Sequence, residues 1–145
     1  MSAALTSDNA REVLEAQPFS RLLGTRLDKF GDGRAELSLE IRDDLRQQFG
    51  FVHGGVLAYL VDNAVTFAAG TVLGPAVLTS GFTISYLAPG KGRELRAYAS
   101  VVHATRRQVV CRCDVMAVDE SGEQTICATG QGTVVARGGE VPAAG

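Results

Sequence analysis

The chain has 145 residues, of which 46% are hydrophobic and 21% charged, a composition typical of a soluble globular protein long enough for one core. Its formal net charge of −2 at pH 7 provides no concentrated basic surface, which argues against a nucleic-acid partner. The first residues show no charged segment followed by an apolar run, and no apolar stretch reaches the ~18 residues of a membrane span. We therefore expect a cytoplasmic protein without a membrane partner.

The cysteines and histidines predict neither disulfides nor a metal site. Cys111, Cys113 and Cys127 are an odd number without an export signal, which indicates a reducing compartment. Cys111 and Cys113 lie two apart in a strand-like run, so they share one face and are expected to be small buried hydrophobes. His53 and His103 form no ligand cluster with them.

The first part of the chain predicts a helix and a hairpin. Residues 1–7 are expected to be flexible, and Asp8 or Asn9 can cap a short helix over 10–17 that Pro18 ends. The segment 22–30 predicts a strand, and the glycines of 31–33 predict a hairpin turn after it. From 34 to 42 polar and apolar residues alternate, which indicates a half-buried antiparallel strand.

A long, largely enclosed helix is predicted over 54–72, where apolar residues recur at helical spacing. Its polar residues form one narrow stripe at i, i+3, i+4 and i+7, namely Tyr59, Asp62, Asn63 and Thr66. Gly74 and Pro75 end the helix. Four strands are then predicted at 76–87, 94–104, 108–118 and 124–136, and the tail 138–145 is expected to be flexible. The order predicts one α+β domain.

The start of the long helix is the strongest candidate for chemistry. Gly54 and Gly55 allow close approach to backbone N–H groups that have no partner within the helix, which suits an oxygen carrying negative charge. Asp62 follows two to three turns later, so an electrophilic carbonyl could dock at the glycines while Asp62 drives a water at it. The alternatives are a flexible helix entry for the glycines, a simple cap for His53 and a solvent-facing Asp62.

Other motifs for well-known chemistries are absent from the sequence. No Gly-x-Ser-x-Gly elbow exists, which argues against a serine hydrolase of the usual α/β type. The segment around Lys91 lacks the upstream glycine and the following hydroxyl residue of a P-loop, and Glu36 stands where a dinucleotide fingerprint needs its third glycine.

The motif Phe49-Gly50-x-x-His53-Gly54-Gly55, with an acid nine positions after the histidine and later Thr79 and Tyr86-Leu87-x-Pro89, resembles the hotdog-fold acyl-CoA thioesterases. It is most similar to the PaaI-like (phenylacetyl-CoA thioesterase-like) branch, over about residues 20–136. The resemblance implies a single hotdog domain over 1–145, with a six-stranded antiparallel sheet wrapped around one long central helix and a short N-terminal helix. It also implies a homodimer whose sheets join, often paired again into a homotetramer as a dimer of dimers, with active sites at the subunit interface.

The resemblance further implies roles for individual residues. Asp62 matches the catalytic acid, acting as a base on water or as a nucleophile through an anhydride, and the Gly55 N–H would polarise the thioester carbonyl. Gln47 falls near the thioester, and His53 supports the turn. Thr79, or its neighbour Ser80, would orient the water from the partner subunit, and Thr66 is a further candidate for holding it.

Substrate contacts are expected from further residues. Gly54 belongs to the glycine turn at the helix start, and Asn63 belongs to the polar stripe of the helix. Tyr59 and Phe67 could shape the acyl pocket. Arginine side chains suit the phosphates of coenzyme A, because a guanidinium group can form paired hydrogen bonds with a phosphate. The candidate arginines, which could equally be exposed charges at strand ends, are Arg106, Arg107 and Arg137.

The sequence thus predicts an acyl-CoA thioesterase that hydrolyses an aryl- or medium-chain acyl-CoA, with coenzyme A as part of the substrate and no separate cofactor. Two alternatives remain. One is a non-catalytic acyl-CoA-binding protein of the same fold, for which a carboxylate at position 62 is hard to explain. The other is a hotdog hydratase or dehydratase, which needs a histidine paired with an acid in the site.

Overall fold

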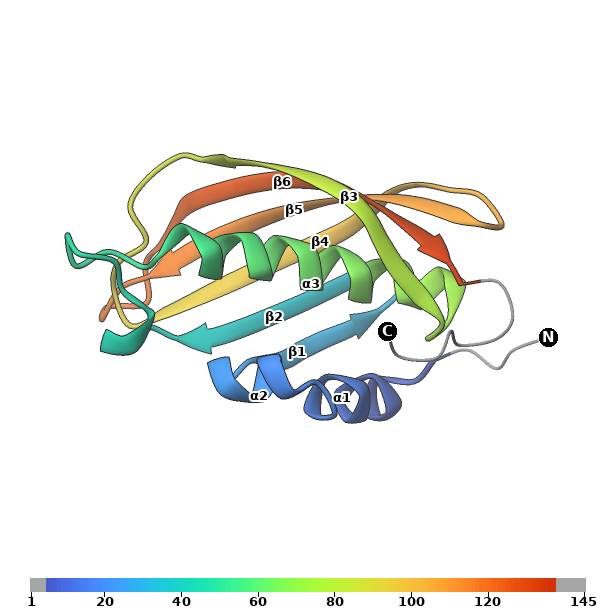
Figure 1. The fold of residues 1–145 in the computed structure, drawn as a ribbon, viewed down its shortest axis with the longest axis horizontal. Helices are drawn as coiled ribbons and strands as arrows, with labels where there is room; N and C mark the ends of the chain where they lie inside the picture. Colours follow the sequence, from blue (N-terminus) through green and yellow to red (C-terminus); the bar gives the residue numbers. More distant parts are fainter. Residues whose placement is uncertain (1–4, 138–145) are drawn as a thin grey trace.

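Helix α3 (Gly54–Leu73) runs along one face of a curved six-stranded sheet in the computed structural model, which describes residues 5–137 (Figure 1). The strand order is β1-β2-β4-β5-β6-β3, and all neighbouring strands are antiparallel. The strands are β1 (Arg26–Gly31), β2 (Arg34–Glu40), β3 (Val77–Tyr86), β4 (Glu94–Ala104), β5 (Gln108–Val118) and β6 (Gln124–Ala136). This confirms the predicted α+β class and the hotdog arrangement of the sheet around one helix.

The sheet and α3 enclose the core. The inward residues of β2, β4 and β5 alternate as predicted, and Cys111 and Cys113 are among them. Burial raises the pKa of Cys111 to about 11 and that of Cys113 to about 12, so both thiols stay protonated near neutral pH. The approach of α3 to β6 requires glycine, because a Cβ on Gly130 would lie 2.7 Å from Cγ1 of Val61.

The composition of α3 corrects one expectation. The helix has 20 residues, and its most apolar 18-residue window has a mean hydropathy of 1.6, so by length and composition alone it could cross a membrane. The sheet wraps it, however, and 56% of its most apolar window is buried inside the domain. A core helix that is covered by a sheet needs the same apolar residues as a spanning helix, which explains why the two patterns coincide.

The N-terminal segment differs from the prediction. Helix α1 (Ser7–Glu15) is capped by Thr6, whose Oγ1 accepts from the Asn9 N–H at 3.1 Å, rather than by Asp8 or Asn9. The predicted strand at 22–30 is wrong in its first part, because α2 (Pro18–Leu23) occupies it and β1 begins only at Arg26. Pro18 begins this second helix. Proline is favoured in the first turn of a helix, because a backbone N–H there has no partner within the helix and proline lacks that N–H.

The ends of the chain also differ from expectation. Ser7 lies inside α1 and Leu5 packs against the core, so 5–7 are ordered rather than flexible. The core includes Ala10 and Leu14, so it begins before residue 20. The remaining positions expected to be flexible, 1–4 and 138–145, lie outside the described residues.

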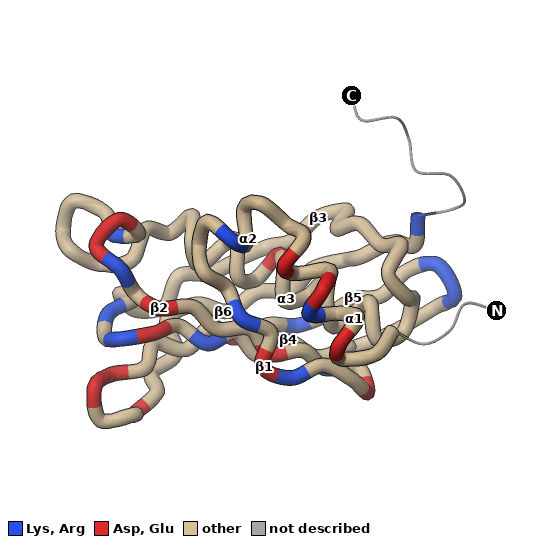
Figure 2. The backbone as a smooth tube through the Cα atoms, turned by 90° about the horizontal axis from the view of Figure 1, so that it is seen from below, with Lys and Arg blue, Asp and Glu red and all other residues tan. Residues whose placement is uncertain are grey.

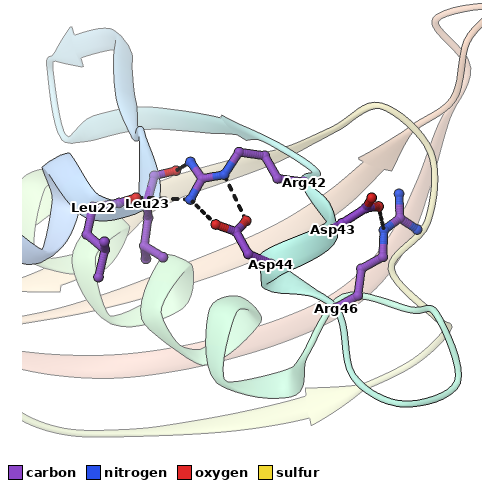
Figure 3. Close-up of polar contacts among 6 residues, drawn as sticks. All are labelled: Leu22, Leu23, Arg42, Asp43, Asp44 and Arg46. Atoms are coloured by element: carbon purple, nitrogen blue, oxygen red, sulfur yellow. Dashed lines mark hydrogen bonds and ion pairs between the residues drawn. The ribbon is translucent and has the colours of Figure 1, made fainter.

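Two arginines hold the loop that leads into α3 (Figure 3). Arg42 donates to the carbonyl oxygens of Leu22 and Leu23 at 3.0 and 3.1 Å and pairs with Asp44 at 3.0 Å, which ties the end of α2 to the loop. Arg46 donates to the Gly50 carbonyl at 2.8 Å and forms an ion pair with Asp43 at 3.3 Å. The Leu45 carbonyl accepts from the His53 N–H at 2.8 Å, so the residue before α3 is fixed from this loop.

Candidate active site

The two glycines at the start of α3 have different hydrogen bonds. His53 caps the helix, and its Nδ1 accepts from the Gly55 N–H at 2.8 Å. Within residues 5–137, the Gly54 N–H has no hydrogen-bond acceptor. The expectation that the Gly55 N–H is open to a carbonyl therefore does not hold in this structure, because the imidazole of His53 occupies it. Gly54 supplies the open donor at the helix start, where the macrodipole favours negative charge.

A cavity of about 380 Å³ lies beside this donor, between the start of α3 and the end of β3. Gly54 and Gln47 both line it. The Gln47 Oε1 accepts from the Phe49 N–H at 2.6 Å, so the amide NH₂ is the part of the side chain left to donate to a ligand. The structure thus brings Gln47 and Gly54 to one cavity, and the two can offer hydrogen bonds to one oxygen.

Tyr86 is a residue of this cavity to which the sequence analysis assigned no role. Its hydroxyl donates to the Gly54 carbonyl at 3.1 Å, and a Cβ on Gly54 would lie 3.3 Å from its ring. A side chain at position 54 would therefore ask the exposed Tyr86 ring to shift by a few tenths of an ångström. The Tyr-Leu-x-Pro motif was the available signal, but nothing in it showed which residue the ring would meet.

Asp62 lies half-buried on the exposed side of α3, and within the described part of the chain its carboxylate has no hydrogen bond or ion pair. Two hydroxyls lie one turn further on. Thr66 Oγ1 donates to the Asp62 carbonyl at 2.8 Å and lies 2.6 Å from Thr79 Oγ1. Since a hydroxyl has one hydrogen, Thr79 must donate to Thr66 and keeps its lone pairs free to accept from a water. We expected Thr79 to act from the partner subunit, but it lies beside the Asp62 turn of its own chain.

Gly54 and Asp62 of one chain are far apart for a single carbonyl group. They are eight residues apart on α3, which corresponds to about 12 Å along the axis at 1.5 Å per residue. The N–H groups at a helix start also point away from the helix body, so an oxygen bound at Gly54 lies further still from Asp62. Each chain therefore carries an oxygen-binding end and an acid that do not meet within it.

Tyr59 and Asn63, predicted to bind substrate, are instead part of a polar network between α3 and α2. The Tyr59 hydroxyl lies 2.7 Å from Ser20 Oγ and donates to Thr25 Oγ1 at 2.8 Å. Asn63 Nδ2 donates to Gln17 Oε1 at 3.2 Å. Their polar groups are bonded within the chain, so this network fastens α2 to α3.

The remaining predicted contacts lie elsewhere. Ser80 Oγ donates to the Thr133 carbonyl at 3.2 Å on exposed β3. Arg106 and Arg107 lie in the turn between β4 and β5, at the end of the molecule where α3 terminates (Figure 1), and Figure 2 shows basic residues in blue on the loop beside the β5 label. Backbone bonds join Arg107 to Ala136 and Arg137 to Ala76, so all three arginines lie at the end opposite to Gly54.

Comparisons with known proteins agree with this arrangement. The family model of the thioesterase superfamily matches residues 49–123, which include the helix start and Asp62. A solved thioesterase family protein from Silicibacter pomeroyi is 32% identical, with a TM-score of 0.82 over 87% of this chain and 93% of its own. The PaaI protein of the Escherichia coli phenylacetic acid degradation operon is 25% identical, with a TM-score of 0.79 over 91% and 93%.

Curated relatives with named activities are similar to the chain as well. The medium/long-chain acyl-CoA thioesterase YigI of Salmonella typhimurium is 27% identical over 83% of this chain and 92% of its own length. The family match covers the structural elements that bear the open Gly54 N–H and the unpaired Asp62. The chain belongs to the thioesterase superfamily.

Proposed function

We propose that the protein hydrolyses acyl-CoA thioesters to the free acid and coenzyme A. The observation that carries the proposal is an unpaired, half-buried carboxylate, Asp62, on the same helix as an open N–H at Gly54. A thioester hydrolase needs both, since one group activates a water and the other stabilises the oxyanion. A cytoplasmic location and coenzyme A as part of the substrate belong to the same proposal.

The reaction assigns a step to each group. The Gly54 N–H and the Gln47 amide NH₂ donate hydrogen bonds to the carbonyl oxygen. Asp62 removes one proton from a water, and the same water donates its other hydrogen to the Thr79 hydroxyl. The water oxygen bonds to the carbonyl carbon, and the charge that develops on the carbonyl oxygen is stabilised at the helix start. The C–S bond then breaks, and the leaving thiolate takes the proton from Asp62. Direct attack by Asp62 would instead form an anhydride that water hydrolyses.

A homodimer unites the two halves of the site. Strand β3 is an edge of the sheet with apolar side chains exposed, such as Leu78 at 56% and Tyr86 at 55%. An exposed apolar edge is a template for another strand, and a two-fold pairing of β3 with its copy sets the two α3 helices antiparallel. The Gly54 end of one protomer then faces the Asp62 region of its partner. A dimer of such dimers is the homotetramer that the resemblance implies.

The same symmetry brings charge to the site. Arg106, Arg107 and Arg137 lie at the far end of α3, so in an antiparallel pair they approach the Gly54 end of the partner. Guanidinium groups bind phosphates through paired hydrogen bonds, and coenzyme A carries phosphates beyond its thiol arm. We assign these arginines to the nucleotide part of the substrate.

Substitution of Asp62 by Asn tests the proposal. The variant keeps the shape of the side chain but cannot take a proton, so we expect kcat to fall by ~10²–10⁴-fold with unchanged secondary structure and oligomer size. The assay follows free thiol released from a panel of acyl-CoAs, with circular dichroism and light scattering as controls for folding and assembly. Turnover equal to wild type in Asp62→Asn would contradict the role of Asp62. Binding of acyl-CoAs by the wild type without thiol release would identify a binding protein instead.

A further inference from the structure

A small cavity lies along α3 beyond Asp62, on the side away from Gly54. It has a volume of about 100 Å³ and is enclosed by α1, the second half of α3 and the segment that leads into β3. Its apolar walls are Leu5, Val13, Phe67, Pro75 and Val77. No charged side chain lines it within the described residues. Such a cavity suits the apolar part of a ligand.

The cavity exists because position 70 is a glycine. Gly70 is a buried residue of α3, yet a Cβ built on it would meet no atom within 4 Å. Its backbone is not in the left-handed region, so the conformation does not require glycine. Glycine weakens a helix interior relative to alanine. Neither backbone geometry nor close packing explains a glycine at position 70. Because Gly70 has no side chain, space is left beside the helix.

The cavity begins one helix turn beyond Asp62. Thr66 lines it, and Thr66 Oγ1 donates to the backbone carbonyl of Asp62 one turn earlier. Gln17 lines it too, and its Oε1 accepts from Ser20 Oγ at 2.6 Å. The Thr66 hydroxyl and the Gln17 Oε1 thus have partners in the chain, while the Gln17 amide NH₂ has none within residues 5–137. An acyl group whose carbonyl is attacked by a water on Asp62 can extend past Thr66 into this space.

We propose that the cavity receives the end of an unbranched alkyl chain and that Gly70 sets the length of acyl chain the enzyme accepts. The inference rests on the proposed thioesterase function and names its substrate class. An apolar cavity of about 150 Å³ holds a benzene ring. The space beside Gly70 is smaller, about 100 Å³, which fits a slim alkyl end and not an aryl group. Straight-chain acyl-CoAs are then the preferred substrates, ahead of aryl ones.

Substitutions at Gly70 test this with a series of straight-chain acyl-CoAs from acetyl to palmitoyl, together with benzoyl- and phenylacetyl-CoA. Gly70→Ala and Gly70→Leu fill the cavity progressively. We expect kcat/KM for the longest good substrate to fall by at least about tenfold in Gly70→Leu, because one methylene in an apolar pocket already changes discrimination by that order. Turnover of short chains stays at the wild-type level, and the best chain length becomes shorter. Val13→Ala enlarges the same cavity and moves the best chain length upward.

Two controls separate this effect from damage to the fold. Gly70→Ala raises the melting temperature, because alanine favours the helix, while it shortens the preferred chain. Val72→Leu adds bulk on the same helix at a residue that is 50% exposed, and it leaves the chain-length profile unchanged. If Gly70→Leu does not fold, Gly70→Ala and Val13→Ala carry the test.

The outcomes distinguish the inference from the proposed function. An unchanged chain-length profile in the Gly70 variants of an active thioesterase overturns the inference alone, and so does a wild-type preference for the aryl substrates. S-alkyl-CoA thioethers, which cannot be hydrolysed, give a second readout by titration calorimetry. If the wild type binds them with an affinity that rises with chain length and Gly70→Leu loses that rise, the cavity is the alkyl site even without turnover. A wild type that neither hydrolyses acyl-CoAs nor binds the thioethers overturns the proposed function, and this inference with it.

Discussion

At the scale of single residues, the two adjacent glycines at the start of α3 have separate tasks. His53 Nδ1 accepts from the Gly55 N–H, and this leaves the Gly54 N–H as the donor that faces outward. The sequence was sufficient to predict an oxygen-binding helix start and a carboxylate further along it. It could not show which N–H is open, because that depends on the rotamer of His53, and a sequence pattern does not define side-chain torsions.

Proline at position 54 removes this donor with little other change. Gly54 is the first residue of α3, where proline is favoured, and His53 has φ −58° and ψ 135°, the extended conformation that a residue before proline prefers. We expect Gly54→Pro to lower kcat by ~10²–10³-fold, the usual cost of losing one oxyanion donor. Gly54→Ala is the matched control, since it makes the same Cβ contact with Tyr86 and keeps the N–H. Equal loss in both variants would assign the effect to the Tyr86 contact instead.

At the scale of elements, the sequence predicted the regular parts and the first N-terminal helix, and it missed the second one, α2. Polar and apolar residues alternate along the sequence of β2, which indicates a strand. Apolar residues form a continuous face along α3, which indicates a helix. Residues 18–23 have neither pattern, and α2 is held there by contacts from distant segments, namely Arg42 on its last carbonyls and the network around Tyr59. Tertiary contacts decide such short helices, since six residues cannot form a stable helix alone. The same contacts bond the polar groups of Tyr59 and Asn63 within the chain.

The network makes a prediction about stability. Ser20 is only 2% exposed and its hydroxyl lies 2.7 Å from the Tyr59 hydroxyl, so Tyr59→Phe leaves buried polar groups with fewer partners. We expect the free energy of unfolding in urea to fall by ~1–3 kcal/mol, while kcat stays within about twofold of wild type. Tyr98→Phe is the control, because the Tyr98 hydroxyl bonds to Gln124 on the exposed surface, where water can replace it. A loss of turnover without a loss of stability in Tyr59→Phe would return Tyr59 to the active site.

At the scale of the whole molecule, the geometry of α3 divides the site between two chains. The spacing of Gly54 and Asp62 was visible in the sequence, but its consequence depends on one straight helix that carries both, with about 12 Å between them. Only the fold shows that β3, with Phe82 36% exposed, is the free edge beside that helix. A two-fold axis at this edge pairs each open N–H with the acid of the other protomer.

Mixed dimers test this division directly. Asp62→Asn and Gly54→Pro are each expected to be nearly inactive alone. When both are produced together in one cell, a mixed dimer has one site that contains both defects and one site in which Gly54 and Asp62 are intact. Random pairing then restores about a quarter of wild-type activity in the unfractionated mixture, since about half of the dimers are mixed and half of their sites are whole. Thiol release is measured on mixed dimers purified through two different affinity tags, and because every dimer is then mixed, about half of wild-type activity is expected. Activity no higher than that of the two variants alone would place Gly54 and Asp62 in the same protomer's site, whereas recovery requires that they act across the interface.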